Sequence, residues 1–265
     1  MISEAETGTQ SIGSRKTRRM RRTGKRGIGP FTFVLLTGAI AWAGPPFKTD
    51  DPQPVDFRHW EFYIASAQSF ERHATEATCP HFEINYGAFK NTQLHIVAPL
   101  GYVRTENGTR YGPGDVEIGV KYRFVEETAT VPQCGVFPLV EVPTGDESRQ
   151  LGAGTVRMYI PLWLQKSWGK LTTYAGGGFW YNPGSEMQNW GFTGWEVQYD
   201  ISDIVTLGGE LYYQTADTRD GVAGRGFNVG GYLNVDENNH ILFSFGRMLS
   251  GEASTTGYIG YQLTI

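Results

Sequence analysis

The chain of 265 residues contains no run of about 18 apolar residues, the length that a transmembrane helix requires. It has only two cysteines, Cys79 and Cys134, so a dense disulfide framework is excluded. It also lacks the His-Glu-x-x-His, Cys-x-x-Cys and Gly-Lys-Ser/Thr motifs of metalloprotease, redox and nucleotide sites. A bundle of transmembrane helices, a disulfide-stapled module and these three kinds of site are therefore not expected.

Positive charge is concentrated near the N-terminus. Residues 15–26 include eight basic residues, residues 31–41 are apolar, and Ala41-Trp42-Ala43 has the small-residue spacing of a cleavage site. This order is typical of a secretory signal peptide, and we expect residues 1–43 to be removed. A basic nucleic-acid-binding arm is the alternative, but it does not explain the apolar stretch or the triplet that follow.

Few basic residues remain after this cleavage. Residues 44–265 contain 15 Lys and Arg against 25 Asp and Glu, a formal net charge of −10. Nucleic-acid binding depends on Lys and Arg that neutralise phosphates, so an acidic chain lacks the electrostatic basis for it. We expect no nucleic-acid partner.

Apolar residues alternate with polar or small ones in the rest of the chain. In the clearest segment, 115–124, every second residue from Val116 to Phe124 is apolar, and most residues between them are charged. Such alternation predicts strands with one face toward lipid and the other toward a lumen. The expected strands are 58–70, 80–89, 92–103, 115–126, 133–143, 155–167, 170–182, 190–200, 204–215, 225–235, 239–248 and 256–265.

The gaps between these strands are alternately long and short. The gaps 104–114 and 144–154 are long, whereas 90–91 and 236–239 are short. Outer-membrane barrels have this arrangement, with long extracellular loops and short periplasmic turns. We therefore predict an all-β, antiparallel transmembrane β-barrel of about 12 strands over residues 57–265, with both ends of the barrel chain on the periplasmic side.

Two parts of this arrangement stay open. The Pro-rich periplasmic leader, residues 44–56, either folds into the barrel mouth as a partial plug or lies on the surface as a flexible segment. In the strand 133–143, Phe137 and Leu139 share the nominal inner face with Glu141. A shift of register by one residue there would exchange its two faces.

The face that the alternation turns inward collects ionisable side chains. Such groups avoid the penalty of an unpaired charge in hydrocarbon by keeping water or by pairing with one another. They line either a polar conduit for solutes or a salt-bridge network that fills a narrow barrel. The candidate lumen-lining residues are Glu61, Glu83, His95, Glu117, Lys121, Arg123, Arg157, Glu196 and Glu210, and His81 and Glu141 share their face.

Several sequence blocks follow the order of one bacterial family. They are GPPFKTDDP (44–52), HWE (59–61), NYG (85–87), GDVEIGVKYRF (114–124), PTGD (143–146) and QKSWG (165–169). With these blocks the chain resembles, over nearly its whole mature length, the outer-membrane family named for the meta-pathway of phenol degradation. The resemblance implies a transporter-like barrel and uptake of aromatic compounds, and it brings no catalytic residues.

A closed structural or adhesion barrel and a barrel-embedded lipid hydrolase are the alternatives. A hydrolase needs a serine and a histidine in hydrogen-bond contact, but His240 and Ser244 are separated by about 13 Å of strand. We therefore expect a non-enzymatic channel for small solutes, with aromatic or other hydrophobic compounds among the candidates, and without catalytic residues, cofactor or metal ion. Its expected partners are outer-membrane lipid and lipopolysaccharide, the barrel-assembly machinery and the small-molecule solute.

Overall fold

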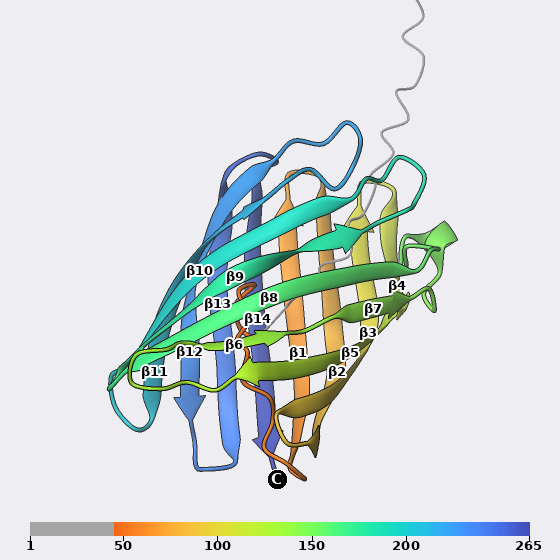
Figure 1. The fold of residues 1–265 in the computed structure, drawn as a ribbon. Helices are drawn as coiled ribbons and strands as arrows, with labels where there is room; N and C mark the ends of the chain where they lie inside the picture. Colours follow the sequence, from red (N-terminus) through yellow and green to blue (C-terminus); the bar gives the residue numbers. More distant parts are fainter. Residues whose placement is uncertain (1–44) are drawn as a thin grey trace, which may run out of the picture. The chain divides into compact units, whose positions relative to one another are not determined.

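The computed structural model describes residues 45–265, which are built almost entirely of β-strands (Figure 1). The expected signal peptide, residues 1–43, lies outside this range. A short 3₁₀ helix, η1, spans Glu147–Arg149, and among the described residues no helix is long and apolar enough to cross a membrane. The strands are β1 (Trp60–Glu71), β2 (Ala74–Phe89), β3 (Thr92–Thr105), β4 (Gly108–Pro113), β5 (Val116–Val125), β6 (Gln133–Val136), β7 (Leu139–Val142), β8 (Arg157–Trp168), β9 (Leu171–Tyr181), β10 (Trp190–Asp200), β11 (Val205–Gln214), β12 (Gly224–Asn234), β13 (Asn239–Ser250) and β14 (Ser254–Thr264).

Antiparallel pairing closes the sheet on itself, because β1 pairs with β14. Two of the barrel strands are interrupted. β4 and β5 both pair with β3, and β6 and β7 both lie between β5 and β8, so each pair of segments forms the two halves of one strand. The result is a closed antiparallel barrel of 12 strands, which confirms the predicted fold class. Closure satisfies the backbone of every strand without leaving an open edge.

The alternation in the sequence corresponds to the two faces of the barrel. On β5, Ile118 and Val120 are exposed, whereas Glu117 and Lys121 are buried. In a closed barrel the buried face is the interior and the exposed face is the outer wall. The outer wall is therefore apolar along its height, through residues that include Ile64, Ile96, Ile118, Ile160, Leu207, Leu211, Val229, Phe245 and Ile259.

Exposed aromatic side chains gather near both ends of the strands. At the end with the short turns they include Trp60, which stacks on Tyr86 with ring centroids 4.2 Å apart. Aromatic belts of this kind mark the two membrane–water interfaces of a transmembrane barrel. The exposed aromatic residues near the strand ends include Trp60, Phe89, Trp168 and Tyr199 at the short-turn end, and Phe70, Tyr111, Tyr181 and Tyr213 at the other.

The strand predicted at 133–143 keeps its nominal register. Phe137, Leu139 and Glu141 are all buried, so the inner face mixes apolar and acidic side chains. The strand is interrupted at Pro138, whose nitrogen carries no hydrogen for the ladder. Phe137 and Leu139 pack in an interior cluster with Tyr159, Trp163, Trp180, Phe192 and Tyr212, which explains an apolar stretch on the lumen side.

The first predicted long loop is mostly strand. β2 begins at Ala74 rather than at residue 80, so only residues 72–73 join it to β1. Pro80 concealed the longer strand in the sequence, because proline cannot donate a ladder hydrogen bond. The ladder passes this proline through a register shift between Thr78 and His81.

The predicted loop 104–114 is also largely a hairpin, because β3 continues to Thr105 and pairs with β4. The connection between β7 and β8 is a true long loop, and the Asp115 carboxylate holds it in place. That carboxylate accepts hydrogen bonds from the backbone nitrogens of Gly145 at 2.9 Å and Ala153 at 2.6 Å. The loop is therefore an ordered cover over the end of β5.

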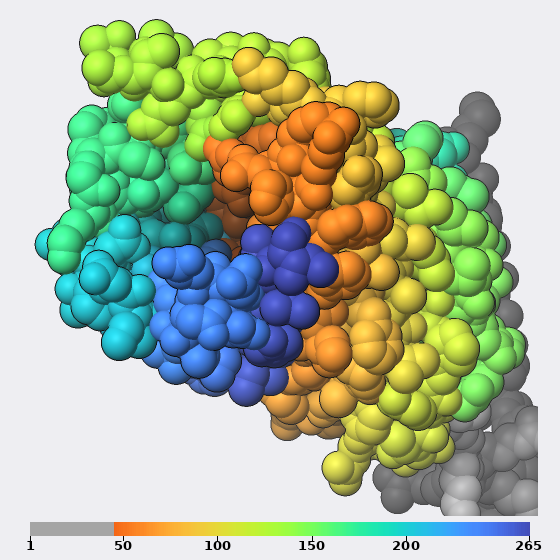
Figure 2. Space-filling view, turned by 90° about the horizontal axis from the view of Figure 1, so that it is seen from below, coloured from red at the N-terminus to blue at the C-terminus, as the bar shows by residue number. Residues whose placement is uncertain are grey.

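Both ends of the barrel chain lie at the short-turn end, where the backbones of Trp60 and Ile265 exchange two hydrogen bonds of 2.7 and 2.9 Å. Residues 45–55 lead into this end from inside the barrel. Phe47, Thr49, Asp50 and Val55 are buried, which places the segment in the lumen rather than along the outer surface. Figure 2, viewed from the end that carries the C-terminus, shows this N-terminal stretch in orange filling part of the barrel mouth.

Candidate functional site

The internal segment, residues 45–55, crosses the lumen between distant strands. At its start, the Tyr232 hydroxyl on β12 donates to the Pro45 carbonyl at 3.1 Å, and the Ser244 hydroxyl on β13 donates to the Pro46 carbonyl. At its end, the Val55 backbone nitrogen donates to the side-chain oxygen of Gln93 on β3 at 2.9 Å. The segment is thus anchored on two walls of the barrel.

Glu210 on β11 forms the first strong anchor of the internal segment. Its buried carboxylate accepts hydrogen bonds from the Lys48 backbone nitrogen at 2.8 Å, and from the backbone nitrogen and hydroxyl of Thr49, both at 2.7 Å. The side-chain amide of Asn228 on β12 donates a fourth, and the Thr256 hydroxyl in turn donates to the side-chain oxygen of Asn228 at 2.8 Å. Hydrogen bonds to an ionised acceptor are the stronger kind, so this carboxylate fixes the middle of the segment.

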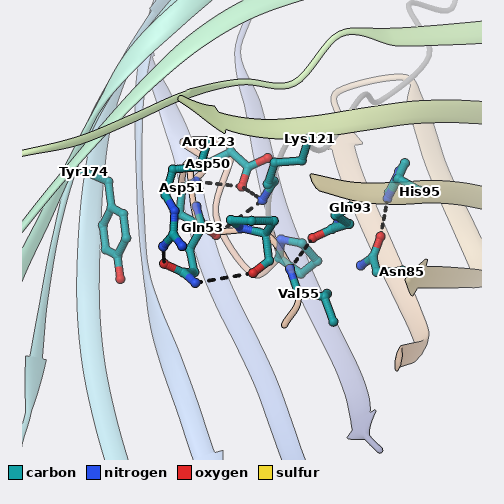
Figure 3. Close-up of polar contacts among 12 residues, drawn as sticks. Asp50, Asp51, Gln53, Val55, Asn85, Gln93, His95, Lys121, Arg123 and Tyr174 are labelled. Carbon is teal, nitrogen blue, oxygen red and sulfur yellow. Dashed lines mark hydrogen bonds and ion pairs between the residues drawn. The ribbon is translucent and has the colours of Figure 1, made fainter. Parts of the chain in front are cut away.

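Lys121 on β5 forms the second anchor (Figure 3). Its Nζ lies 3.0 Å from the Asp50 carboxylate and 3.5 Å from the Asp51 carboxylate. It also lies 4.9 Å from the centroid of the Phe137 ring, within the range of a cation–π contact. Lys121 and Asp50 are both almost fully buried, so each charge depends on the other for compensation.

Arg123, two residues along β5, continues this contact toward the short-turn end. Its guanidinium donates to the side-chain oxygens of Gln53 in the internal segment, Gln133 at 3.2 Å and Asn91 at 2.7 Å. Figure 3 shows Arg123 and Lys121 side by side, both directed at the internal segment. Two basic residues of one strand therefore hold the second half of the segment.

A separate polar network lies on β2, β3 and β5. His95 contacts the Asn85 oxygen through Nδ1 at 2.7 Å and the Glu117 carboxylate through Nε2 at 3.0 Å. The Asn85 amide donates to Glu83 at 2.8 Å, and Phe137 packs edge-on against the His95 ring at 5.0 Å. Within residues 45–265, no hydrogen bond or ion pair joins this network to the internal segment, so the network belongs to the wall of the barrel.

The remaining inner carboxylates also have local partners. Glu141 on β7 pairs with Arg157 on β8, two residues that face each other across the strand pair. Glu196 on β10 accepts from the Gln198 amide at 2.6 Å, and Glu61 accepts from the Tyr63 hydroxyl at 2.8 Å. The interior is therefore a set of separate polar clusters rather than one continuous network.

The structure places all nine candidate lumen-lining residues on the inner face. Seven of them are buried, namely Glu83, His95, Glu117, Lys121, Arg157, Glu196 and Glu210, whereas Glu61 and Arg123 are half-buried. The structure brings His95 together with Glu83 and Glu117. Among the described residues, no basic side chain lies within ion-pair distance of Glu196.

Sequence reasoning placed Glu210, Lys121 and Arg123 on the inner face but missed their pairing with the internal segment. The prolines of the segment, with Lys48, Asp50 and Asp51, argued only against a lipid-facing strand, and nothing local indicated the partners of these residues. Gln93 and Asn228 fell on the predicted inner face, which was the available signal for them. The partners of the internal segment lie up to 198 positions away from it in the chain.

A small pocket lies between the internal segment and the aromatic cluster. Its walls are formed by Lys48, Leu139, Tyr159, Trp180, Trp190, Phe192 and Gln214. Trp180 stacks between Trp190 and Tyr159, with ring centroids 5.6 and 4.8 Å away. The Lys48 ammonium lies 4.7 Å from the centroid of the Tyr212 ring. The pocket thus combines a stack of flat aromatic rings with one basic group.

Burial lowers the pKa of the Lys48 amino group below its usual value, because the charged form loses hydration. The Glu210 and Asp217 carboxylates act in the opposite direction. An additional negative charge beside the Lys48 amino group would also raise its pKa.

His240 and Ser244 do not form a catalytic pair. The His240 ring contacts the Asn234 side-chain oxygen at 2.8 Å, and the Ser244 hydroxyl is engaged by the Pro46 carbonyl. The serine on this strand therefore anchors the internal segment.

Comparison with known proteins finds structures of the same fold but no relative in sequence. No known family profile matches the chain, and no curated protein matches it in sequence. Among solved structures, an outer membrane channel from Pseudomonas putida F1 is similar with a TM-score of 0.68 and 14% identity, over 81% of this chain and 98% of that one.

Two further structures have the same type of barrel. The translocator domain of the autotransporter NalP from Neisseria meningitidis has a TM-score of 0.54 and 11% identity, over 79% of this chain and 89% of that one. The KdgM porin in complex with disordered oligogalacturonate has a TM-score of 0.52 and 13% identity, over 76% of this chain and 98% of that one. At these identities the likeness is one of fold, and the fold is that of outer-membrane barrels.

Proposed function

We propose that the protein is a channel of the bacterial outer membrane for small solutes, and that residues 45–55 narrow its lumen. The observation that carries this proposal is the contrast between the two faces of a closed barrel. An apolar wall with aromatic belts suits lipid, and an inner wall of paired charges suits water and polar solutes. The shared fold with outer-membrane channels supports the same conclusion.

The internal segment sets the expected behaviour of this channel. Because it is anchored by Glu210 on one side and by Lys121 and Arg123 on the other, it occupies lumen that would otherwise hold water. Conductance should therefore be small, and the inner residues around the segment should determine which solutes pass through the channel. Carboxylates outnumber basic groups on the inner face, which favours cations over simple anions.

The partners follow from the location. Outer-membrane lipid and lipopolysaccharide contact the apolar wall and its rim, and the barrel-assembly machinery inserts the chain after its signal peptide is removed. The resemblance of several sequence blocks to the family of the meta-pathway of phenol degradation extends the proposal to aromatic or other hydrophobic solutes. No enzymatic activity is part of the proposal.

A closed structural or adhesion barrel is the second candidate, and the same segment favours it. Hydrogen bonds and an ion pair hold residues 45–55 at both ends and in the middle, as expected for a permanent filling of the lumen. The two candidates differ in whether any continuous aqueous path remains beside the segment.

Planar-bilayer recordings of three purified proteins distinguish the candidates. They are the full chain, a variant with residues 46–54 replaced by a Gly-Ser sequence of equal length, and a control with the same kind of replacement in the loop 218–223. A channel narrowed by the segment gives small conductance steps in the full chain and the control, and much larger steps in the first variant. A full chain and control that are silent over a wide range of salt, together with a conducting first variant, indicate the closed barrel.

A further inference from the structure

Charged side chains are sorted by sign between the two faces of the described strands. Every aspartate and glutamate of β1–β14 occupies an inward position, whereas the charged residues at outward positions are all basic. These basic residues are Arg104 on β3, Lys166 on β8, Arg225 on β12 and Arg247 on β13. The Lys166 ammonium pairs with Glu127 at 2.8 Å near the short turns, so the three arginines at the opposite end of the barrel are the ones to explain.

Two of these arginines, Arg225 and Arg247, lie on neighbouring strands. Both are exposed, and Arg247 alternates with Met248, whose side chain packs on the interior aromatic cluster. Arg247 is paired across the ladder with Phe227, two residues from Arg225, so the two arginines are diagonal neighbours with Cα atoms about 7–8 Å apart. Two long side chains that start from such positions can reach one ligand group on the outer wall.

Hydrogen-bond donors flank the arginine pair on both sides. Tyr213 on β11 lies directly opposite Arg225, and Thr255 on β14 lies directly opposite Arg247. Tyr213 belongs to the aromatic belt at this end, which places the pair at a membrane–water interface and not at the bilayer midplane. In the part of the chain that the structure describes, neither guanidinium forms a hydrogen bond or an ion pair. Both charges are therefore available to an anion outside the barrel.

The wall on the midplane side of the arginine pair is apolar. Phe245, two residues from Arg247, faces Val229 across the two strands, and their exposed fractions are 58% and 52%. A ligand that fits both the arginines and this wall carries an anionic group at the interface and hydrocarbon chains below it. That combination is the chemistry of an anionic lipid, because a free anion would use only the arginines.

The donor set and the position of the pair indicate which lipid this is. The planar guanidinium fork of arginine matches phosphate oxygens, often with two hydrogen bonds each. In an outer-membrane barrel the end with the long loops faces the outer leaflet, where lipopolysaccharide carries phosphates directly above its acyl chains. Glu71 and Glu76, at the same end, occupy inward positions, so negative charge is kept inside the mouth of the barrel and away from the arginines.

We propose that Arg225 and Arg247 form a binding site for a phosphate group of lipopolysaccharide, with the acyl chains of the lipid along Val229 and Phe245. The inference rests on the location and orientation given under the proposed function, where lipopolysaccharide is a general partner of the rim. It assigns that partner to one face of β12 and β13 and to one chemical group. The lipid site lies on the outer wall, separate from the solute path in the lumen.

Native mass spectrometry of the purified barrel in a neutral detergent tests the proposal without requiring conduction. The probe is diphosphoryl lipid A, compared with lipid A stripped of its phosphates and with phosphatidylglycerol, and inorganic phosphate serves as a competitor. The variants Arg225→Gln and Arg247→Gln each remove one charge. Arg104→Gln is the matched control, because Arg104 is an exposed outward arginine at the same end of the barrel, between Thr75 and Thr109 on the neighbouring strands. Retained resistance to detergent unfolding verifies that each barrel is intact.

The expected result is saturable binding of diphosphoryl lipid A that Arg225→Gln and Arg247→Gln each weaken about tenfold, the loss of one charge-assisted contact. Arg104→Gln should retain this binding, and the two comparison lipids should bind more weakly than the probe.

Four results would overturn the inference. Unchanged binding in both Gln variants means that the pair is not the site, and an equal loss in Arg104→Gln means that any charge on the rim serves. Equal binding of phosphate-free lipid A or of phosphatidylglycerol removes the specificity for lipopolysaccharide phosphate, and displacement of lipid A by inorganic phosphate at millimolar concentration indicates a site for the free anion. Each leaves the channel proposal standing if the barrel conducts, whereas a silent barrel that binds lipid A through both arginines rejects the pore and retains the lipid site.

Discussion

Replacement of Glu210 by glutamine probes the anchor on which the internal segment depends most. The Glu210 carboxylate accepts four hydrogen bonds, and three of them come from Lys48 and Thr49. A glutamine has nearly the same shape but offers one acceptor oxygen and one NH₂ group. The substitution therefore keeps the packing and removes the charge and about half of the acceptor capacity.

The expected magnitude follows from these contacts. Each hydrogen bond to a charged group contributes about 1.5–3 kcal/mol, and at least two of them lose their acceptor in Glu210→Gln. The free energy that holds residues 45–55 in place should fall by about 3 kcal/mol. That change raises the open fraction of the segment about a hundredfold.

Hydrogen exchange followed by mass spectrometry measures this opening directly. The backbone amides of Lys48 and Thr49 both donate to Glu210, so their peptide should exchange about a hundred times faster in the variant. The matched control is Glu196→Gln. Glu196 is buried directly opposite Glu210 on the neighbouring strand, but its described hydrogen bond is to Gln198 and not to the segment.

The reasoning is refuted by either of two results. Unchanged exchange of this peptide in Glu210→Gln would mean that the segment is held by packing alone. Equal acceleration in Glu196→Gln would mean that loss of any inner charge loosens the barrel, and that the contacts at Lys48 and Thr49 have no special role.

Three further predictions concern the chain as a membrane protein. N-terminal sequencing of protein from the outer-membrane fraction should find cleavage after Ala43, and an uncleaved soluble protein would contradict this. Val120→Arg should reduce the free energy of folding into lipid vesicles by about 2–4 kcal/mol, because Val120 is exposed on the outer wall. Glu117→Gln, on the inner face, should be far better tolerated. Equal tolerance of the two substitutions would contradict the assignment of the two faces. Cys79 and Cys134 are free thiols on β2 and β6, so intact mass after alkylation should show both modified under oxidising conditions, and a bridge between them would require a different register.

Part of this structure was determined by local sequence. A period of two residues is a property of each strand by itself, so the strand set and the assignment of faces followed from the alternation around residues such as Ile118 and Lys121. The strand count followed from the sequence as well, because long and short gaps alternate between the predicted strands. One error fell where a proline breaks the local pattern, at Pro80 in β2, and another where the hairpin of β3 and β4 replaced the predicted loop 104–114.

Partners across the barrel were decided only by tertiary structure. Glu117, Glu141 and Glu210 look alike in the sequence, yet one contacts His95, one pairs with Arg157, and one holds the internal segment. The partner of each glutamate depends on the register of the neighbouring strands and on closure of the barrel. Neither is encoded within ten residues of the glutamate.

The internal segment shows the same division most clearly. Proline and charge in residues 44–56 argued against a lipid-facing strand, and the segment alone did not decide between a partial plug and a surface segment. Its position in the lumen depends on Glu210 and Lys121, which lie 161 and 71 positions from the residues they hold. Only when the barrel closes do these two side chains face one space, and the buried charges in that space are compensated by threading the N-terminal segment between them.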